Sequence, residues 1–281
     1  MKLKNFYFLL MIFLFALGCA AAPLVVETYK TSSLGKGIKG AAESLQPIGE
    51  EEEKTIGGSL AIQVFNRFGG MYDNADLQRY ISLIGRALAD VSDRPDLDYH
   101  FAIVNSEQPN AFATPGGYVF VTAGLLRMME NEAQLAGVLG HEIAHVTHRH
   151  ALQTLERSKK LSGFGALTVG MLGQDPSLFD KVIEQAGEII FKFGLDKNLE
   201  YEADKMGTEY AFRLGYNSSG LKNFLDILKQ SLPGRESVFL STHPSPQDRL
   251  NQLAGLAAEY QSGFSNPLFA AEFQQATQGK F

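Results

Sequence analysis

His141 and His145 are four positions apart, and Glu142 lies between them in the pattern His-Glu-x-x-His. In an α-helix, side chains four residues apart project from the same face, so both imidazoles can bind one metal ion. Glu142 would lie beside them, where its carboxylate could take a proton from a metal-activated water. This combination predicts a zinc hydrolase site. The alternative is an ordinary amphipathic helix in which two histidines coincide by chance.

The segment around these histidines has the pattern of an α-helix over residues 132–156. Asn131 is a suitable N-cap, and Gln134 follows three residues later, as in a capping box. The chain has six histidines, and four of them fall between residues 141 and 150. His148 and His150 lack the spacing to bind the same ion, so we expect them on the polar face or behind the ligands. Apolar residues recur at helical intervals, at Leu135, Val138, Leu139 and Val146.

A third ligand is predicted about fifty residues downstream, because a catalytic zinc usually has three protein ligands and an open position. Residues 178–214 have a helical pattern, in which Glu200 and Asp204 share a face and Glu202 points elsewhere. Glu200 is therefore the candidate ligand. Asp204 is a candidate acceptor for the outer ring nitrogen of a ligating histidine. The alternative is a solvated acidic helix face, the usual meaning of such a cluster.

Four segments, in this order, resemble metallopeptidase family 48, the HtpX and prenyl-protein protease type of gluzincin. The similarity covers roughly residues 50 to 256. It implies one Zn²⁺ per chain, held by His141, His145 and Glu200, with Glu142 as general base and acid. The four segments are residues 110–121 (Asn-Ala-Phe-Ala-Thr-Pro-Gly-Gly-Tyr-Val-Phe-Val), 141–145, 200–204, and 241–244 (Ser-Thr-His-Pro) followed by Arg249.

Residues 110–121 are similar to the family's edge strand beside the active-site cleft. A substrate peptide would add to such a strand through backbone hydrogen bonds, a mode that depends on extension more than on side-chain identity. The sequence Pro-Gly-Gly would form the turn at its start, and a plain hairpin is the alternative. The substrate contacts that this resemblance implies are Asn110, Ala111, Ala113, Pro115, Gly116, Gly117 and Arg249.

His243 resembles the histidine that approaches the metal in periplasmic members of the family. As a catalytic residue it could donate to the developing oxyanion, or it could occupy the fourth metal position and hold the enzyme latent. An ordinary loop histidine before a proline is the alternative. Arg249 is expected to orient that loop or to contact a substrate carbonyl, with a surface salt bridge as its alternative.

The N-terminus has the pattern of a bacterial lipoprotein signal. Lys2 and Lys4 precede a short apolar stretch, residues 5–17, which is too short to span a membrane. The following Ala-Leu-Gly-Cys resembles a lipobox, and Cys19 is the single cysteine, so we expect it to carry lipid. Ala20, rather than aspartate, follows it, which by resemblance favours the outer membrane. Cleavage near Ala20, Ala21 and Ala22, giving a soluble periplasmic protein, is the alternative.

Length and charge bound the rest of the chain. About 260 residues after the signal can form one full core, and a net charge of -6 without a basic stripe argues against nucleic-acid binding. The glycine-rich segment 163–173 is expected to pack closely against a helix. A mobile lid over the active-site cleft, hinged on its glycines, is the alternative. We predict a signal peptide at 1–18, a tether at 19–48, a metallopeptidase domain at 49–261 and a loose tail at 262–281.

The predicted fold is α+β and helix-dominated, a zincin-like metallopeptidase with a small sheet whose edge strand flanks the cleft. The metal-ligand helices would hold the site, and the sheet would bind the substrate. Further helices are expected at 50–65, 76–91, 219–232 and 246–260, and strands at 99–104 and 118–121.

Together these features predict a zinc metalloendopeptidase of the bacterial cell envelope, on its periplasmic side. By resemblance, its substrates would be unfolded, misfolded or misassembled envelope proteins. A chaperone-like client-binding protein with a latent zinc site is the alternative, although metal binding alone would not need Glu142. A structural zinc protein is a third possibility, but structural sites are usually closed by four ligands rich in cysteine.

Overall fold

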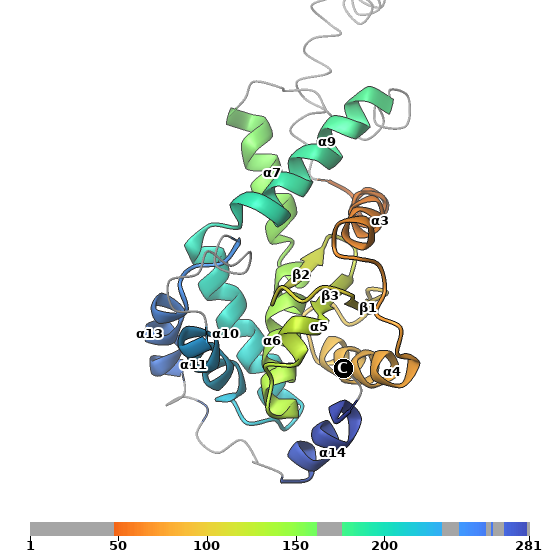
Figure 1. Ribbon diagram of the computed structural model, residues 1–281. Helices are drawn as coiled ribbons and strands as arrows, with labels where there is room; N and C mark the ends of the chain where they lie inside the picture. The colour runs from red at the N-terminus through yellow and green to blue at the C-terminus, as the bar shows by residue number, and fades with distance from the viewer. Residues whose placement is uncertain (1–47, 162–175, 232–241, 257–259, 261–266, 280–281) are drawn as a thin grey trace, which may run out of the picture.

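The computed structural model describes residues 48–161, 176–231, 242–256, 260 and 267–279 (Figure 1). The predicted signal peptide, the tether with Cys19 up to residue 47, and the glycine-rich segment 163–173 lie outside the described residues. Within the described ranges, no helix combines the length and the apolar character that crossing a bilayer requires.

Three short strands form a mixed sheet. They are β1 (His100–Val104), β2 (Ala111–Thr114) and β3 (Tyr118–Thr122), and β3 lies between the other two. β1 runs parallel to β3, whereas β2 runs antiparallel to β3 as the first arm of a hairpin. The predicted strands and the helix-dominated α+β class are confirmed. Because β2 pairs with β3 alone among the described strands, it forms an edge of the sheet.

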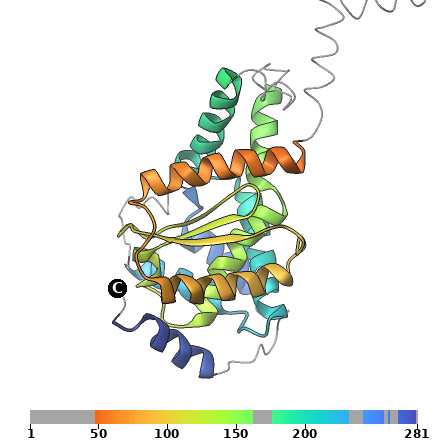
Figure 2. The same cartoon turned by 90° about the vertical axis from the view of Figure 1, so that its right-hand side faces the viewer.

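Side-chain alternation places the sheet between two apolar clusters. Helix α3 (Glu50–Arg67) covers one face and α4 (Ala75–Asp90) covers the other, as Figure 2 shows. Both faces are therefore buried, which explains why the strands are apolar at almost every position. Phe101, Ile103, Val119 and Val121 belong to the α4 cluster, and Ala102, Val104, Phe112 and Phe120 belong to the α3 cluster.

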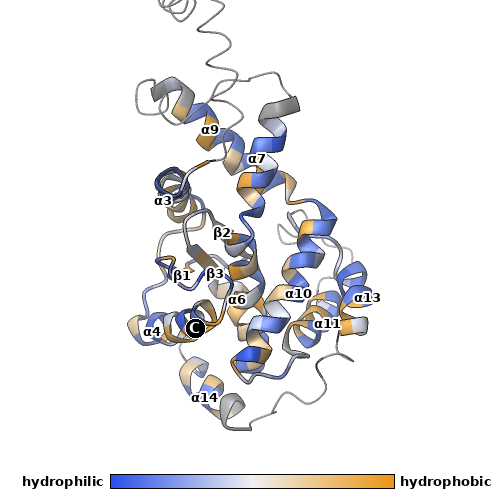
Figure 3. Cartoon of the chain, turned by 180° about the vertical axis from the view of Figure 1, so that it is seen from behind, coloured by the Kyte–Doolittle hydropathy of each residue, from blue (hydrophilic) through white to orange (hydrophobic). Residues whose placement is uncertain are grey.

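Helix α6 (Glu132–Thr147) carries His141, Glu142 and His145 through the centre of the molecule. Its N-cap is Asn131, as predicted, and the Asn131 side chain accepts a hydrogen bond from the Gln134 amide at 3.1 Å. Nearly every α6 residue is buried. Figure 3 shows the corresponding contrast between the apolar centre and the more hydrophilic outer helices. A helix buried on all sides can hold polar side chains only in a specific site.

The predicted helix over residues 132–156 is interrupted. α6 ends at Thr147 and α7 (His150–Leu161) begins after Arg149, whose φ is 55°. Such a positive φ is strained for a residue with a side chain, so surrounding contacts must maintain it. The Arg149 guanidinium donates to the Ile48 carbonyl, and its Nε lies 3.1 Å from Glu53 Oε2. Contacts remote in the sequence therefore fix a turn that local pattern does not reveal.

The single helix predicted over residues 178–214 is also wrong. The structure has α9 (Pro176–Glu188), a π-helical turn η1 (Ile189–Phe193) and α10 (Lys197–Arg213). Gly194 separates η1 from α10 with a φ of 71°, and a Cβ at this position would lie 2.1 Å from the Thr242 carbonyl oxygen. Glycine is required here both for the backbone conformation and for this close approach.

The remaining helices of the described residues are α5 (Ala123–Leu126), α11 (Gly220–Ser231), α13 (Pro246–Leu256) and α14 (Pro267–Thr277). The expectation of a loose tail over 262–281 is wrong for its described part. Phe273 of α14 is 2% exposed and belongs to the same apolar cluster as α4 and α6. Its ring centroid lies 6.5 Å from that of Tyr80 on α4. The core therefore extends past residue 261, because an aromatic residue near the C-terminus completes it.

Candidate metal centre

The predicted ligands converge between α6 and α10. His141 Nε2 and His145 Nε2 are 3.0 Å apart, and the two Glu200 carboxylate oxygens lie 3.6 and 3.5 Å from them. Zn–N bonds of about 2.0–2.1 Å in tetrahedral geometry imply ligand atoms about 3.3 Å apart. Glu200 Oε1 is buried without a hydrogen bond, and a cation would satisfy it. The donor set therefore fits a zinc ion.

Two glycines allow the ligand helices to touch. A Cβ on Gly140 of α6 would lie 2.6 Å from the Gly207 carbonyl oxygen, and a Cβ on Gly207 of α10 would lie 2.4 Å from the His141 amide nitrogen. These distances are shorter than real carbon contacts, so any side chain at either position would separate the helices. The backbone contact thus sets the distance between the histidine pair and Glu200.

Replacing Gly207 by alanine is therefore expected to lower stability by about 1–3 kcal/mol, the usual cost of overpacking. It should also weaken zinc binding, because α6 and α10 carry different ligands. Urea unfolding and zinc titration measure the two effects. Gly255→Ala on α13 is the matched control, since a Cβ there meets nothing within 4 Å. Equal behaviour of the two variants would contradict the role of this contact.

A buried ion pair supports His141 from behind. Asp204 Oδ1 lies 2.9 Å from His141 Nδ1, the outer ring nitrogen where an acceptor was expected. Arg249 binds the same carboxylate through two nitrogens, with Nη2 2.6 Å from Oδ1 and Nε 3.0 Å from Oδ2. Arg249 is 1% exposed. The predicted contact of Arg249 with a substrate carbonyl is wrong, and so is the surface salt bridge, because the guanidinium is buried behind the ligands.

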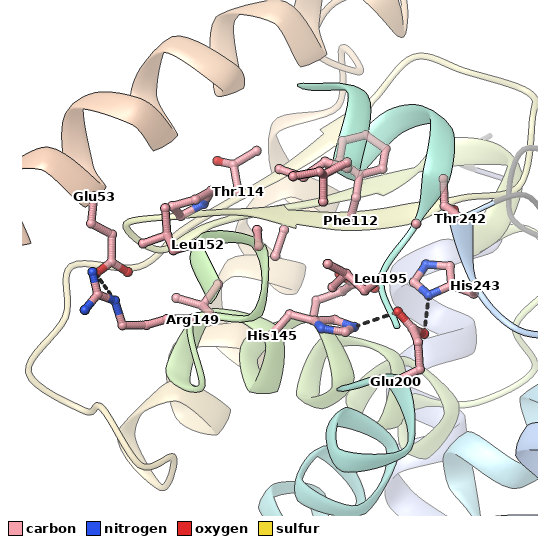
Figure 4. Close-up of a pocket in the computed structure, with 18 residues that line it drawn as sticks. Glu53, Phe112, Thr114, His145, Arg149, Leu152, Leu195, Glu200, Thr242 and His243 are labelled. Carbon is pink, nitrogen blue, oxygen red and sulfur yellow. Dashed lines mark hydrogen bonds and ion pairs between the residues drawn. The ribbon is translucent and has the colours of Figure 1, made fainter. Parts of the chain in front are cut away.

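His243 reaches the same centre from the segment before α13. Its Nδ1 lies 2.7 Å from Glu200 Oε2, and its ring is buried (Figure 4). One ligand atom from each of His141, His145, Glu200 and His243 lies within 4.8 Å of the others. His243 is thus no ordinary loop residue. The close approach of Thr242 to Gly194 holds this segment over α10.

Glu142 lies beside the edge strand, where it forms a hydrogen bond with the backbone of Ala113 in β2. Burial raises the pKa of Glu142 from 4.5 to about 7, although His243 and a backbone hydrogen bond with Ala113 of β2 oppose the increase. Burial also holds the pKa of His141 and of His145 well below 6.5. Neutral imidazoles are the form that binds metal, and a carboxyl group with a pKa near 7 is suited to proton transfer.

The pKa of Glu142 predicts how the metal-free protein responds to pH. Because its pKa is raised in the folded state, Glu142 favours folding when it is protonated. Its contribution to stability is complete below pH 4.5 and is lost as the pH rises through 7. Glu142→Gln should therefore be more stable than wild type at pH 8, by about 3 kcal/mol, and equally stable at pH 4. Urea unfolding in excess chelator measures this difference. Glu51→Gln, at a carboxylate that is 90% exposed, serves as the control and should not reproduce the gain.

A pocket opens next to these groups. Among the predicted substrate contacts, Ala113 and Pro115 line this pocket, whereas Asn110, Ala111, Gly116 and Gly117 do not. The Pro-Gly-Gly turn is instead buried against α3, where Gly116 donates a hydrogen bond to Glu53. The hairpin alternative and the edge-strand expectation therefore both describe parts of the same element. The apolar wall of the pocket is formed by Phe112, Leu152, Ile189, Ile190 and Leu195 (Figure 4).

Sequence reasoning missed the buried glutamate at one end of this pocket. Glu53 is 1% exposed and forms ion pairs with Arg94 at 2.8 Å and with Arg149 at 3.1 Å. It stands in a run of four glutamates, residues 50–53, at the start of α3. The signal available was its spacing, since Glu53 lies on the same helical face as Ile56, Gly57 and Leu60.

The central and C-terminal parts of the chain, residues 75–257, match the model of peptidase family M48. The chain belongs to this family. The M48 match includes both ligand helices, the hairpin and the segment with His243. M48 members are metallopeptidases, in agreement with the four-residue group that the fold brings together.

Curated relatives of this M48 chain include proteases of bacteria and mitochondria. The beta-barrel assembly-enhancing protease of Escherichia coli K12 is 30% identical over 218 residues, covering 75% of this chain and 44% of that protein. The corresponding protein of Yersinia pestis is 34% identical over 62% of this chain and 38% of its own length. The mitochondrial metalloendopeptidase OMA1 of Schizosaccharomyces pombe is 28% identical over 62% of this chain and 51% of its own. The chain thus spans about half or less of these relatives.

Proposed function

We propose that this M48 member is a zinc-dependent endopeptidase of the bacterial cell envelope. One observation carries the proposal: His141, His145 and Glu200 form a buried set with tetrahedral spacing, and Glu142 lies between that set and the edge strand. A binding protein would need the edge strand alone. Burial that raises the pKa of a carboxyl group to about 7 beside a metal-ligand set is typical of sites where a proton has to move.

In this reaction the zinc ion, when bound, would polarise the scissile carbonyl and activate a water molecule. The Glu142 carboxylate takes a proton from the attacking water and returns a proton to the leaving amine. The free edge of β2 binds the substrate backbone in an extended form next to Glu142. Asp204 accepts from His141 Nδ1 and so holds the ring with Nε2 directed at the ion.

The substrate class follows from the recognition mode. Strand addition selects segments that are extended and free of their own tertiary structure, which describes unfolded or misassembled proteins better than native ones. The names of the relatives from Escherichia coli and Yersinia pestis associate such proteases with β-barrel assembly. Together with the lipobox pattern that ends at Cys19, this supports envelope protein quality control on the periplasmic side, with a lipid anchor in the outer membrane.

The test is cleavage of casein, an unfolded substrate, by the chain from Ala20 onward. We expect one tightly bound zinc ion per chain, cleavage that a chelator abolishes, and recovery when one equivalent of zinc is returned. Mass spectrometry of the products distinguishes internal cleavage from removal of terminal residues. Cleavage that persists without metal, or zinc binding with no cleavage by either wild type or His243→Ala, would contradict the proposal. The second result would favour the client-binding alternative.

His243 decides whether the resting enzyme is open. Because its Nδ1 lies 2.7 Å from Glu200 Oε2, it can take part in the ligand set or donate to charge beside it. In His243→Ala, a rise in casein cleavage would identify His243 as a fourth ligand that closes the site. A fall by about 100-fold would identify it as an oxyanion donor, since loss of one such donor costs about that much.

A further inference from the structure

A second cluster of metal-binding side chains lies beside the first. His148, at the end of α6, and His150, at the start of α7, both face Glu202 of α10. His148 Nδ1 lies 3.1 Å from Glu202 Oε1, and His150 Nε2 lies 3.5 Å from Glu202 Oε2. One ligand atom from each residue lies within 4.8 Å of the other two. Two imidazoles and a carboxylate are a ligand set that zinc accepts.

The turn at Arg149 creates this cluster. Within one continuous helix, positions 148 and 150 would point in different directions. The left-handed conformation of Arg149 starts α7 in a new orientation and brings both rings to the same carboxylate. Their ring centroids are 5.6 Å apart.

The atoms of the cluster are placed so that they can bind a cation. His150 is fully buried, yet its Nε2 makes no hydrogen bond and points at Glu202. An unsatisfied buried polar atom costs about 1–3 kcal/mol, so such an atom aimed at two other ligands marks a candidate site. On the outer side of the other ring, His148 Nε2 lies 3.4 Å from Asp93 Oδ2. This carboxylate lies behind the ring, as carboxylates do behind metal-binding histidines, but His148 Nε2 makes no hydrogen bond with it.

The two clusters are in direct contact through their histidines. His145 Nδ1 and His150 Nδ1 are 2.9 Å apart, a distance that needs one proton between them. When Nε2 of His145 holds an ion, its proton is on Nδ1 and is donated to His150. An ion on His150 Nε2 would place that ring's own proton on Nδ1 as well, and two N–H groups would then face each other.

We propose that His148, His150 and Glu202 form a second zinc site, and that an ion bound there opposes ion binding at His141, His145 and Glu200. The second site needs only its own three residues. The opposition between the two ions rests on the proposed function, because it requires an ion on His145. Excess zinc would thus inhibit the enzyme at a defined place outside the substrate pocket.

Zinc titration of the metal-free chain by calorimetry tests the site without measuring cleavage. We expect two ions per chain in wild type, and one in His148→Ala and in Glu202→Gln. Glu202 has a side chain that is 47% exposed, so its substitution leaves the core intact if His148→Ala does not fold. His100→Ala is the control, because its ring is 48% exposed on β1 beside Asp98, and it should bind two ions.

The opposition is measured with His141→Ala, which removes a ligand of the first site alone. The second site should then bind zinc about 10-fold more tightly than in wild type, within the usual range of coupling between sites. In wild type, casein cleavage should fall several-fold as the second ion binds, and Glu202→Gln should lose this inhibition. An ion count that His148→Ala and Glu202→Gln leave unchanged would overturn the second site. Equal second-site affinity in His141→Ala and wild type would overturn the opposition. Absence of cleavage in all these proteins and in His243→Ala would refute the peptidase and leave the ion count valid.

Discussion

Glu142→Gln is expected to reduce casein cleavage by about 100- to 10,000-fold, the range that general acid–base catalysis contributes. Glutamine has nearly the same shape as glutamate but cannot accept the proton, so the loss should appear in kcat rather than in KM. The zinc content should be unchanged, because Glu142 is not among the four residues whose ligand atoms gather at the site. Initial rates and metal analysis on the same preparation measure both quantities.

The matched control for this variant is Glu132→Gln. Glu132 is a buried glutamate on the same helix, 4% exposed, and its carboxylate accepts hydrogen bonds from Tyr80 and Tyr216. The same substitution there removes a buried carboxylate without touching the reaction. Cleavage should survive in Glu132→Gln and disappear in Glu142→Gln. Residual cleavage in Glu142→Gln near the wild-type rate would assign the base to another residue and leave the role of Glu142 unexplained.

The metal helix was predictable because its information is local. His141 and His145 share a face through the helical repeat alone, and Asn131 starts the helix by capping it. The same repeat placed Glu200 and Asp204 together, even though the predicted helix around them began too early. Two residues four apart share a face in any helix that extends about one turn to each side of them. The prediction for Glu200 and Asp204 was therefore correct although the predicted start of the helix was wrong.

The breaks between helices were not predictable, because distant contacts impose them. Arg149 has no local reason to adopt a positive φ, and it does so where Glu53 and the Ile48 carbonyl bind its guanidinium. Gly194 ends the π-helical turn where the Thr242 backbone crosses. Each break depends on contacts with segments roughly 50 to 100 residues away, and the local hydrophobic periodicity contains no information about such contacts. These breaks position the pocket wall and the second histidine cluster, so neither could be predicted from the sequence.

Arg249 illustrates a different limit. Its spacing after the Thr-His-Pro segment suggested a role near the substrate, but spacing cannot tell which side of the ligands a side chain reaches. The structure turns it toward Asp204 and buries it. Charged residues are almost never fully buried unless paired. The sequence identified Asp204 as a partner of a ligating histidine, but it did not indicate that Asp204 also pairs with Arg249.

Arg249→Met is accordingly expected to destabilise the fold by about 3–5 kcal/mol, because it leaves the Asp204 carboxylate buried without its main partner. Zinc affinity should fall about 10- to 100-fold, the usual cost of losing support behind a ligand, since His141 depends on Asp204. Arg249→Lys should recover little, because one ammonium cannot reproduce the two bonds from Nε and Nη2. Urea unfolding and zinc titration measure the two effects.

The double variant Arg249→Met with Asp204→Asn separates an unpaired charge from lost packing. Removing both charges should restore much of the stability, because replacing a whole buried pair costs far less than breaking it. Zinc affinity should stay low, since neutral asparagine is a weaker acceptor for His141. Lys54→Met is the surface control: its ion pair with Glu51 is exposed, so it should cost less than about 1 kcal/mol. If Arg249→Met costs no more than that control, the ion pair does not hold the metal ligands in place.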